Sequence, residues 1–192
     1  IWLFINNGSG GFPSNGIPFI NAGLTIPDQY AFSNLDLIAV GDLNNDGLHD
    51  ILISNQSGTL DGTAYFENLN STIPPYFGLT GAQTFNGSTI VNPFLPDDSG
   101  SYHTPEIYDA DCDGDLDVLS AGGYDGLYWY ENTDGQGSFG AGQYIAAEYS
   151  FRFDVADLDG DGNMDVVSTG RPPYGNSGYQ TTWYRNVPSV KK

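Results

Sequence analysis

Four aspartates lie within nine residues in the segment DLDGDGNMDVVSTG at 157–170. Carboxylates held about 4–5 Å apart near a protein surface repel one another, at roughly 1 kcal/mol or more for each pair. A divalent cation removes this repulsion. Ca²⁺ takes about six to eight oxygen ligands at ~2.3–2.6 Å, and carboxylates are its usual partners in proteins. The segment therefore predicts a calcium site.

The same pattern, D-x-[DN]-x-D-G-x-x-D, occurs three times, at 42–50, 109–117 and 157–165. These 27 residues contain 12 of the 24 acidic residues of the chain. Three bound Ca²⁺ ions would bring the formal net charge from −19 to −13. The repetition in one context predicts about three ions, whereas a single copy could be a chance Asp- and Gly-rich turn.

Each nonapeptide can wrap an ion if alternate residues point inward. Positions 1, 3 and 5 then supply side-chain oxygens, and glycine at position 6 adopts the positive φ that turns the chain back. Position 7 offers its backbone carbonyl, and position 9 supplies a final carboxylate from the first residue of the next strand. The predicted ligands are Asp42, Asn44, Asp46, Leu48 and Asp50; Asp109, Asp111, Asp113, Asp115 and Asp117; and Asp157, Asp159, Asp161, Asn163 and Asp165.

Other calcium motifs share the start of this pattern. An EF-hand loop has twelve residues, ends on Glu and is followed by a helix, and a dockerin also continues into a helix. Here the last acidic residue is at position 9, and largely β-branched runs follow at 51–54, 118–120 and 166–168. The sequence therefore predicts that each loop leads into a strand.

The elements that must position these loops also repeat. An aromatic segment recurs as AYFEN at 64–68, YWYEN at 128–132 and TWYRN at 182–186, with a looser copy, WLFIN, at 2–6. Glycine-rich turns follow it, and no window shows helical periodicity. Short strands in units of about 50 residues are typical of β-propeller blades. The aromatic residues are interpreted as packing between blades.

The units resemble FG-GAP/VCBS-type repeats, the blades of the integrin-α-like β-propeller, and the segment at 103–139 is the most similar. The resemblance implies blades of four antiparallel strands with Ca²⁺ between the first two strands. It also implies a secreted or cell-surface setting and a non-catalytic role in adhesion or in binding a protein or glycan.

We therefore expect an all-β fold, with residues 1–192 forming one propeller segment. Residues 1–35 would be a partial blade and connection, 36–102 a blade with an insertion at about 70–100, and 103–150 and 151–192 two further blades. About three blades and a fraction are too few to close a ring. Further blades are expected from the rest of a longer chain or from another subunit.

The composition of the chain excludes some classes of binding partner. A net charge of −19 disfavours nucleic acid and anionic lipid, no apolar run is long enough for membrane insertion, and the single cysteine, Cys112, cannot form an intrachain disulfide. The ligand candidates in the insertion are Tyr76, Phe77 and Phe94, and glycosylation is left open at Asn7, Asn55, Asn70 and Asn86.

No catalytic residue is predicted. The chain could instead belong to a secreted polysaccharide-active enzyme, for which the candidate carboxylates Glu106, Glu148 and Asp154 have no diagnostic spacing. A third alternative is a structural subunit of a surface assembly.

Overall fold

The structure is a computed structural model of the chain. It describes residues 2–3, 9–12, 14, 17–18, 35–55, 62–68, 77–78, 103–122, 126–146, 149–171 and 178–187. Most of the predicted insertion at 70–100 lies outside these residues. So do Glu148, Tyr76 and Phe94, and the sequons at Asn7, Asn70 and Asn86.

The described residues form antiparallel sheets in which strands that follow one another in sequence are neighbours. The first sheet contains β3 (Leu35–Gly41), β4 (Asp50–Asn55), β5 (Gly62–Asn68) and β6 (Phe77–Gly78). The second contains β7 (His103–Tyr108), β8 (Asp117–Gly122), β9 (Gly126–Tyr130) and β10 (Gln143–Ala146). The third contains β11 (Tyr149–Ala156), β12 (Asp165–Arg171) and β13 (Gln180–Tyr184), and β1 (Trp2–Leu3) pairs with β2 (Ile17–Pro18).

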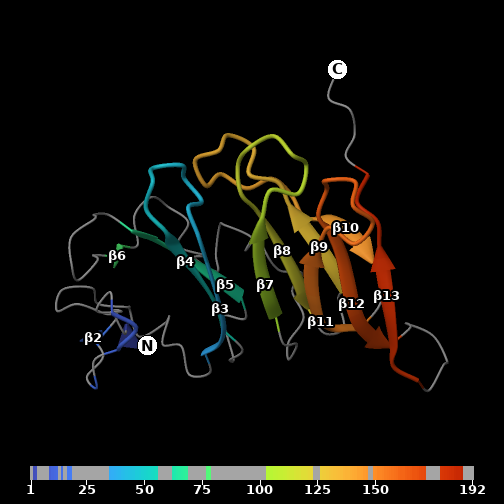
Figure 1. Ribbon diagram of the computed structural model, residues 1–192, viewed down its shortest axis with the longest axis horizontal. Helices are drawn as coiled ribbons and strands as arrows, with labels where there is room; N and C mark the ends of the chain where they lie inside the picture. The colour runs from blue at the N-terminus through green and yellow to red at the C-terminus, as the bar shows by residue number, and fades with distance from the viewer. Residues whose placement is uncertain are drawn as a thin grey trace.

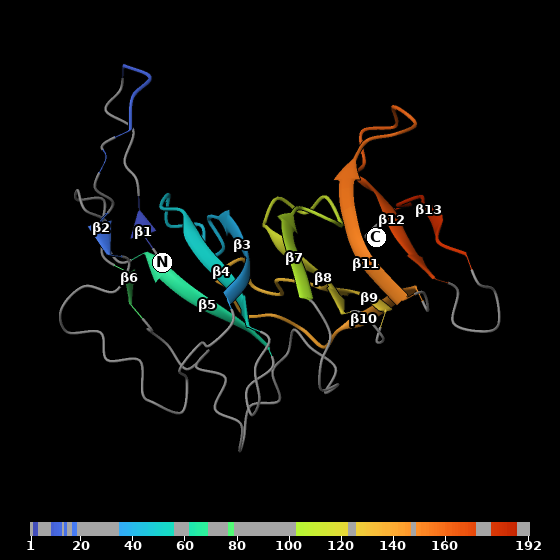
Figure 2. The same cartoon turned by 90° about the horizontal axis from the view of Figure 1, so that it is seen from below.

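The three larger sheets stand side by side in chain order (Figures 1 and 2). The prediction of an all-β chain made of antiparallel sheets is confirmed, with four strands in each of the first two sheets and three described strands in the third. The described strands do not form a closed ring. Among the described residues, no helix is long and apolar enough to cross a membrane.

Side chains from neighbouring sheets pack together in two apolar clusters. Leu43, Leu52 and Tyr65 of the first sheet and its loop meet Val118 and Tyr130 of the second. The other cluster lies between the second and third sheets and includes Leu119, Leu127, Phe153 and Val166. Burying this apolar surface between sheets is what holds each sheet against the next.

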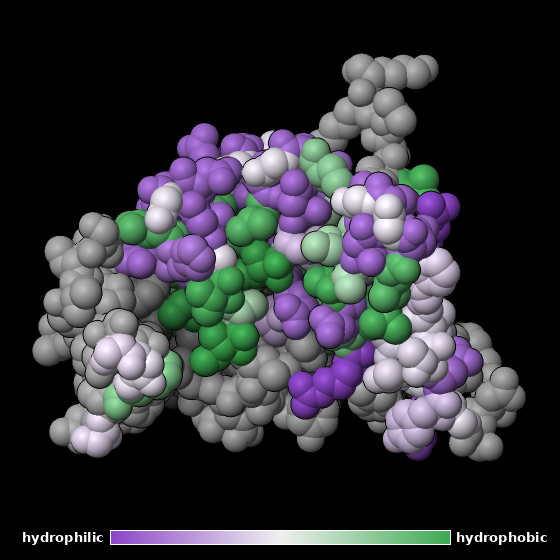
Figure 3. Space-filling view, viewed as in Figure 1, coloured by the Kyte–Doolittle hydropathy of each residue, from purple (hydrophilic) through white to green (hydrophobic). Residues whose placement is uncertain are grey.

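The aromatic side chains of the third strands differ in burial from sheet to sheet. Tyr65 and Tyr130 are buried in the cluster between the first and second sheets, as the packing interpretation predicts, and Phe66 is also buried. Trp183, the residue of the third sheet equivalent to Tyr65, is 50% exposed. Figure 3 shows hydrophilic residues gathered over the loops at one edge of the sheets, with apolar residues below them.

Candidate metal centres

Three loops lie along the same edge of the sheets, at the top of Figure 1, and connect the first strand of each sheet to the second. Residues 42–50, 109–117 and 157–165 are called here the first, second and third loops, and each includes its position-9 aspartate. A strand, not a helix, begins at that aspartate, at Asp50, Asp117 and Asp165. The predicted place of the loops and the strands that follow them are confirmed.

The carboxylate at position 1 shapes each loop by accepting backbone N–H groups. In the second loop Asp109 Oδ1 accepts from Asp113 N at 3.1 Å, and Oδ2 accepts from Gly114 N at 3.1 Å. The side chain at position 3 adds a bond from the same N–H, since Asp113 N also donates to Asp111 Oδ1 at 3.2 Å. The first and third loops repeat all three hydrogen bonds.

The glycine at position 6 has the predicted positive φ in every loop: 86° at Gly47, 102° at Gly114 and 91° at Gly162. No atom lies within 4 Å of where a Cβ would stand at these glycines. The requirement for glycine is therefore one of backbone conformation and not of space.

Position 4 is also left-handed, which the sequence analysis missed. Asn45 has a φ of 56°, Cys112 of 62° and Gly160 of 78°. Asn and Gly are the residues that adopt this conformation most readily, so their presence in two of the three loops was the available signal. The Cys112 thiol, exposed on the second loop, donates to Asn163 Oδ1 of the third loop at 3.3 Å.

The aspartate at position 9 is inaccessible to solvent in all three loops. Asp117 Oδ2 accepts from Ala110 N of its own loop at 3.0 Å, and Oδ1 accepts from Asn132 N, just beyond the third strand, at 2.8 Å. The same pair of bonds surrounds Asp50 and Asp165. Each position-9 carboxylate thus ties its loop to the residue that follows or ends the third strand, at the same edge of the sheet.

Burial raises the pKa of both Asp50 and Asp117, although the backbone N–H groups that they accept act in the opposite direction. Burial, followed by the charges of Asp113 and Asp117, raises the pKa of Asp115 to about 6. Asp115 Oδ1 is also buried without a hydrogen-bond partner among the described residues. No positively charged group of the described residues contributes to the raised pKa values of Asp115 and Asp117, and a cation in the second loop would supply that charge.

The carboxylates converge in two of the loops. One oxygen each from Asp109, Asp111 and Asp117 lies within 4.8 Å of the others, and Asp157, Asp159 and Asp165 meet the same condition. Oxygens bound to one Ca²⁺ at ~2.3–2.6 Å must lie within about 5 Å of one another, so both sets fit the ion. Asp113 and Asp161 lie outside these two sets.

The remaining predicted ligands lie in the same loops. Asp42, Asn44, Asp46 and Asp50 frame the first loop, whose Asp46 Oδ1 accepts from Leu48 N at 2.8 Å. In the third loop Asp161 Oδ1 accepts from Asn163 N at 2.9 Å, and Asp115 N donates in the same way to Asp113 in the second. Ligation by the carbonyls of Leu48, Asp115 and Asn163 stays a prediction.

In the second and third units, the asparagine that ends the aromatic segment links neighbouring sheets, a role that the sequence analysis did not assign. Asn132 Nδ2, on the second sheet, donates to the carbonyl of Leu43 in the first loop at 2.9 Å. Asn186 Nδ2 donates in the same way to the carbonyl of Ala110 in the second loop at 2.6 Å. The only trace of this role in the sequence was the same asparagine at the end of all three segments.

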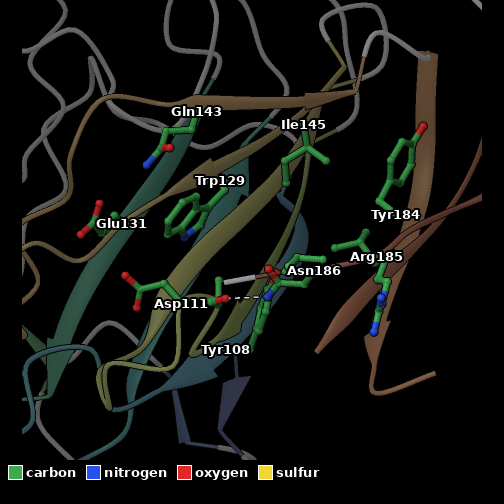
Figure 4. Close-up of a pocket in the computed structure, with 12 residues that line it drawn as sticks. Tyr108, Asp111, Trp129, Glu131, Gln143, Ile145, Tyr184, Arg185 and Asn186 are labelled. Carbon is green, nitrogen blue, oxygen red and sulfur yellow. Dashed lines mark hydrogen bonds between the residues drawn. The ribbon is translucent and has the colours of Figure 1, made fainter. Parts of the chain in front are cut away.

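A cavity of about 430 Å³ opens between the second and third sheets (Figure 4). Aromatic side chains of Tyr108, Trp129 and Tyr184 line it together with the polar side chains of Glu131 and Gln143. Such a combination of aromatic faces and a few polar groups is typical of small-ligand sites.

Residues 109–168, from the second loop into β12, match the family model of the FG-GAP-like repeat. The resemblance to FG-GAP-type repeats is confirmed over these residues, which include both loops with converging carboxylates. No curated protein matches the chain.

Proposed function

We propose that the chain is a calcium-stabilised β-propeller module that acts outside the cell and binds a protein or glycan without catalysis. The observation that carries the proposal is the convergence of three carboxylates in each of two equivalent loops, one of them fully buried. The match to an FG-GAP-like repeat supports it, because such repeats are typically extracellular.

Calcium would stabilise the fold through the position-9 aspartates. Without a cation, Asp117 holds a carboxylate away from water beside the acidic groups of its own loop. A bound ion compensates these charges only in the folded loop, so binding favours the folded state by mass action. All three loops, with about three ions, are expected to contribute.

The experiment is thermal unfolding of calcium-stripped protein with and without added calcium, because chelation is expected to lower the melting temperature. The variant Asp111→Asn should lose part of the calcium-induced rise, since it removes a converging carboxylate. Asp134→Asn is the matched control, because Asp134 is an exposed acid outside the loops. An unfolding transition that calcium does not move would refute the proposal.

The cavity between the second and third sheets supports a small-molecule or glycan ligand. Sugars stack their apolar faces on aromatic rings and hydrogen-bond to carboxylates and amides, both of which line this cavity. We expect Glu131→Gln and Gln143→Ala to weaken binding on a glycan array. Tyr144→Ala, which changes an exposed ring outside the lining, should leave binding unchanged.

One observation favours the enzyme alternative. Burial raises the pKa of Glu106 on β7, and the charge of Asp154 on β11 raises it further. A carboxyl of raised pKa near a second carboxyl group is the arrangement used in glycoside hydrolysis. Release of reducing ends from a polysaccharide that disappears in both Glu106→Gln and Asp154→Asn would establish this function in place of the non-catalytic one.

We also propose that the third sheet packs against a further repeat unit of the same kind. The position-2 residue of the first two loops is buried: Leu43 is 0% exposed and Ala110 is 7% exposed. The position-2 residue of the third loop, Leu158, is 52% exposed. The carbonyls of Leu43 and Ala110 accept an asparagine amide from the next sheet. Within the described part of the chain, no donor reaches the carbonyl of Leu158.

Thiol labelling in a Cys112→Ser background tests this packing. Leu158→Cys should react at least tenfold faster than the covered control Ala110→Cys. Replacing residues 187–192 by a copy of residues 133–187 supplies the next unit and should slow Leu158→Cys to the control rate. Labelling that stays fast in the extended chain contradicts the proposal. If labelling of Leu158→Cys in the unextended chain slows as the protein concentration rises, a second copy of the chain covers this face. That result also contradicts the proposal.

A further inference from the structure

The residue before the linking asparagine differs in charge among the three units. It is Glu67 in the first unit, Glu131 in the second and Arg185 in the third. Because these residues hold equivalent places at the end of the third strand of each sheet, their side chains should approach equivalent parts of their own loops. The difference therefore places opposite charges against three otherwise similar acidic loops.

Two contacts show which part of the loop this side chain reaches. In the first unit Glu67 Oε1 accepts from the amide of Asn44, at position 3 of the loop, at 3.2 Å. In the third unit Arg185 Nε pairs with Asp159, also at position 3, at 2.5 Å. Arg185 Nη2 pairs with Asp161 Oδ2 at 3.0 Å. The side chain before the asparagine thus contacts position 3 of its own loop.

Arg185 binds carboxylates that a calcium ion would need. Asp159 is one of the three converging aspartates of the third loop, and Asp161 is a predicted ligand. A guanidinium is always protonated in proteins, so Arg185 brings a full positive charge to these two carboxylates. A unit positive charge close to the ion site opposes a second cation by direct repulsion.

The second loop has the opposite arrangement. Five aspartates lie within it, and Glu131 stands where the third unit has Arg185. Figure 4 shows Glu131 on the same side of the cavity as Asp111, the position-3 residue. The second loop therefore gathers six acidic residues, whereas the third has four acidic residues and one arginine.

We infer that Arg185 serves as an internal counter-cation of the third loop. It neutralises part of the loop without a metal, and Ca²⁺ must displace it to bind. The third loop consequently binds Ca²⁺ at least tenfold more weakly than the second. This inference rests on the proposed calcium function and makes the three sites unequal.

The test is a calcium titration that resolves the loops, using the backbone amide signals of Gly47, Gly114 and Gly162 in an NMR spectrum. In the native chain Gly162 should shift at calcium concentrations at least tenfold higher than Gly114. Arg185→Glu, which copies the residue of the first two units, should bring Gly162 close to Gly114. Arg185→Gln should give an intermediate result.

Arg152→Gln is the matched control for the loss of one positive charge. Arg152 pairs with Thr169, four ladder positions from the loop, and its replacement should not move the Gly162 transition. The reciprocal change Glu131→Arg should weaken binding at Gly114 and leave Gly162 unchanged.

Calcium-free protein gives a second measurement, because Arg185→Gln should lower its melting temperature while it strengthens calcium binding. The inference is wrong if Gly162 and Gly114 titrate together in the native chain and Arg185→Gln changes neither. In that case the proposed function survives, since all loops still bind. If none of the three glycine signals responds to calcium, the proposed function fails together with this inference.

Discussion

The side-chain amide of Asn132 donates to the carbonyl of Leu43, 89 residues earlier in the chain and in a different sheet. The same amide also donates to the carbonyl of Leu116 at 3.2 Å, and Asn132 is only 1% exposed. One buried side chain thus holds the backbone of two acidic loops at once.

Asn132→Ala is expected to destabilise the fold by about 3 kcal/mol, because two carbonyls lose a buried donor and each costs about 1–3 kcal/mol. Urea denaturation at saturating calcium measures this change in the free energy of unfolding. Gln136→Ala, an exposed change in the turn that follows, should stay within about 0.5 kcal/mol of the native chain. A loss equal to that of the control would show that the link between the sheets carries no stability.

Alanine at two glycines should separate backbone strain from steric overlap. Gly114 has a φ of 102° and no atom near a would-be Cβ, so Gly114→Ala should destabilise by about 1–2 kcal/mol. Gly126 has a φ of 97°, and a Cβ there would stand 2.2 Å from the carbonyl oxygen of Ala146. Gly126→Ala should therefore be clearly more destabilising in the same urea experiment. Equal losses of unfolding free energy in the two variants would show that overlap with the Ala146 carbonyl adds no cost at Gly126.

Calcium-stripped protein should become more stable as the pH falls from about 7.5 to about 5. Burial raises the pKa of Asp50 and Asp117 and, with the charges of Asp113 and Asp117, brings that of Asp115 to about 6. A carboxyl with a higher pKa in the folded state stabilises the fold while protonated, and this contribution is lost as the pH rises through that pKa.

The same pH series at saturating calcium should show the opposite slope, because protons compete with the ion for the same oxygens. Melting temperatures at constant ionic strength measure both slopes. Metal-free protein is used without a chelator, since the affinity of a chelator also changes with pH. Parallel slopes with and without calcium would mean that the buried carboxylates are not the calcium ligands.

Glu106→Gln should raise the melting temperature at neutral pH. Burial and the charge of Asp154 raise the pKa of Glu106, so ionisation of Glu106 above its ordinary value of 4.5 weakens the fold. Glutamine cannot ionise, and the difference should disappear once the pH falls below that value. Asp154→Asn should produce a smaller gain in the same direction. A lower melting temperature for Glu106→Gln at pH 7 would show that the carboxylate has a stabilising partner.

The sequence predicted the local part of the site well. The loops, the left-handed glycine at Gly114 and the strand that begins at Asp117 were all foreseen, because they depend on residues within nine positions of one another. The link from Asn132 to Leu43 could not be foreseen in the same way. It depends on how two sheets pack, and no spacing rule connects residues so far apart.

The sequence pattern also did not predict the ion pair between Arg185 and the third loop. Arg185 was seen only as part of an aromatic segment, and its ion pair with Asp159 follows from the way β13 returns toward the loop. The exposure of Trp183 likewise reflects what packs on the third sheet and not the residue type, since Tyr65 at the equivalent place is buried.

The hydrogen bonds around the position-9 aspartates join into one continuous chain across the sheets. Asp50 accepts from Leu43, whose carbonyl accepts from Asn132, and the backbone N–H of Asn132 donates to Asp117. Ala110 and Asn186 continue the chain to Asp165. An ion that orders the first loop therefore pre-organises the second, so calcium uptake followed at Gly47 and Gly114 should be positively cooperative, with a Hill coefficient above one that returns to one in Asn132→Ala.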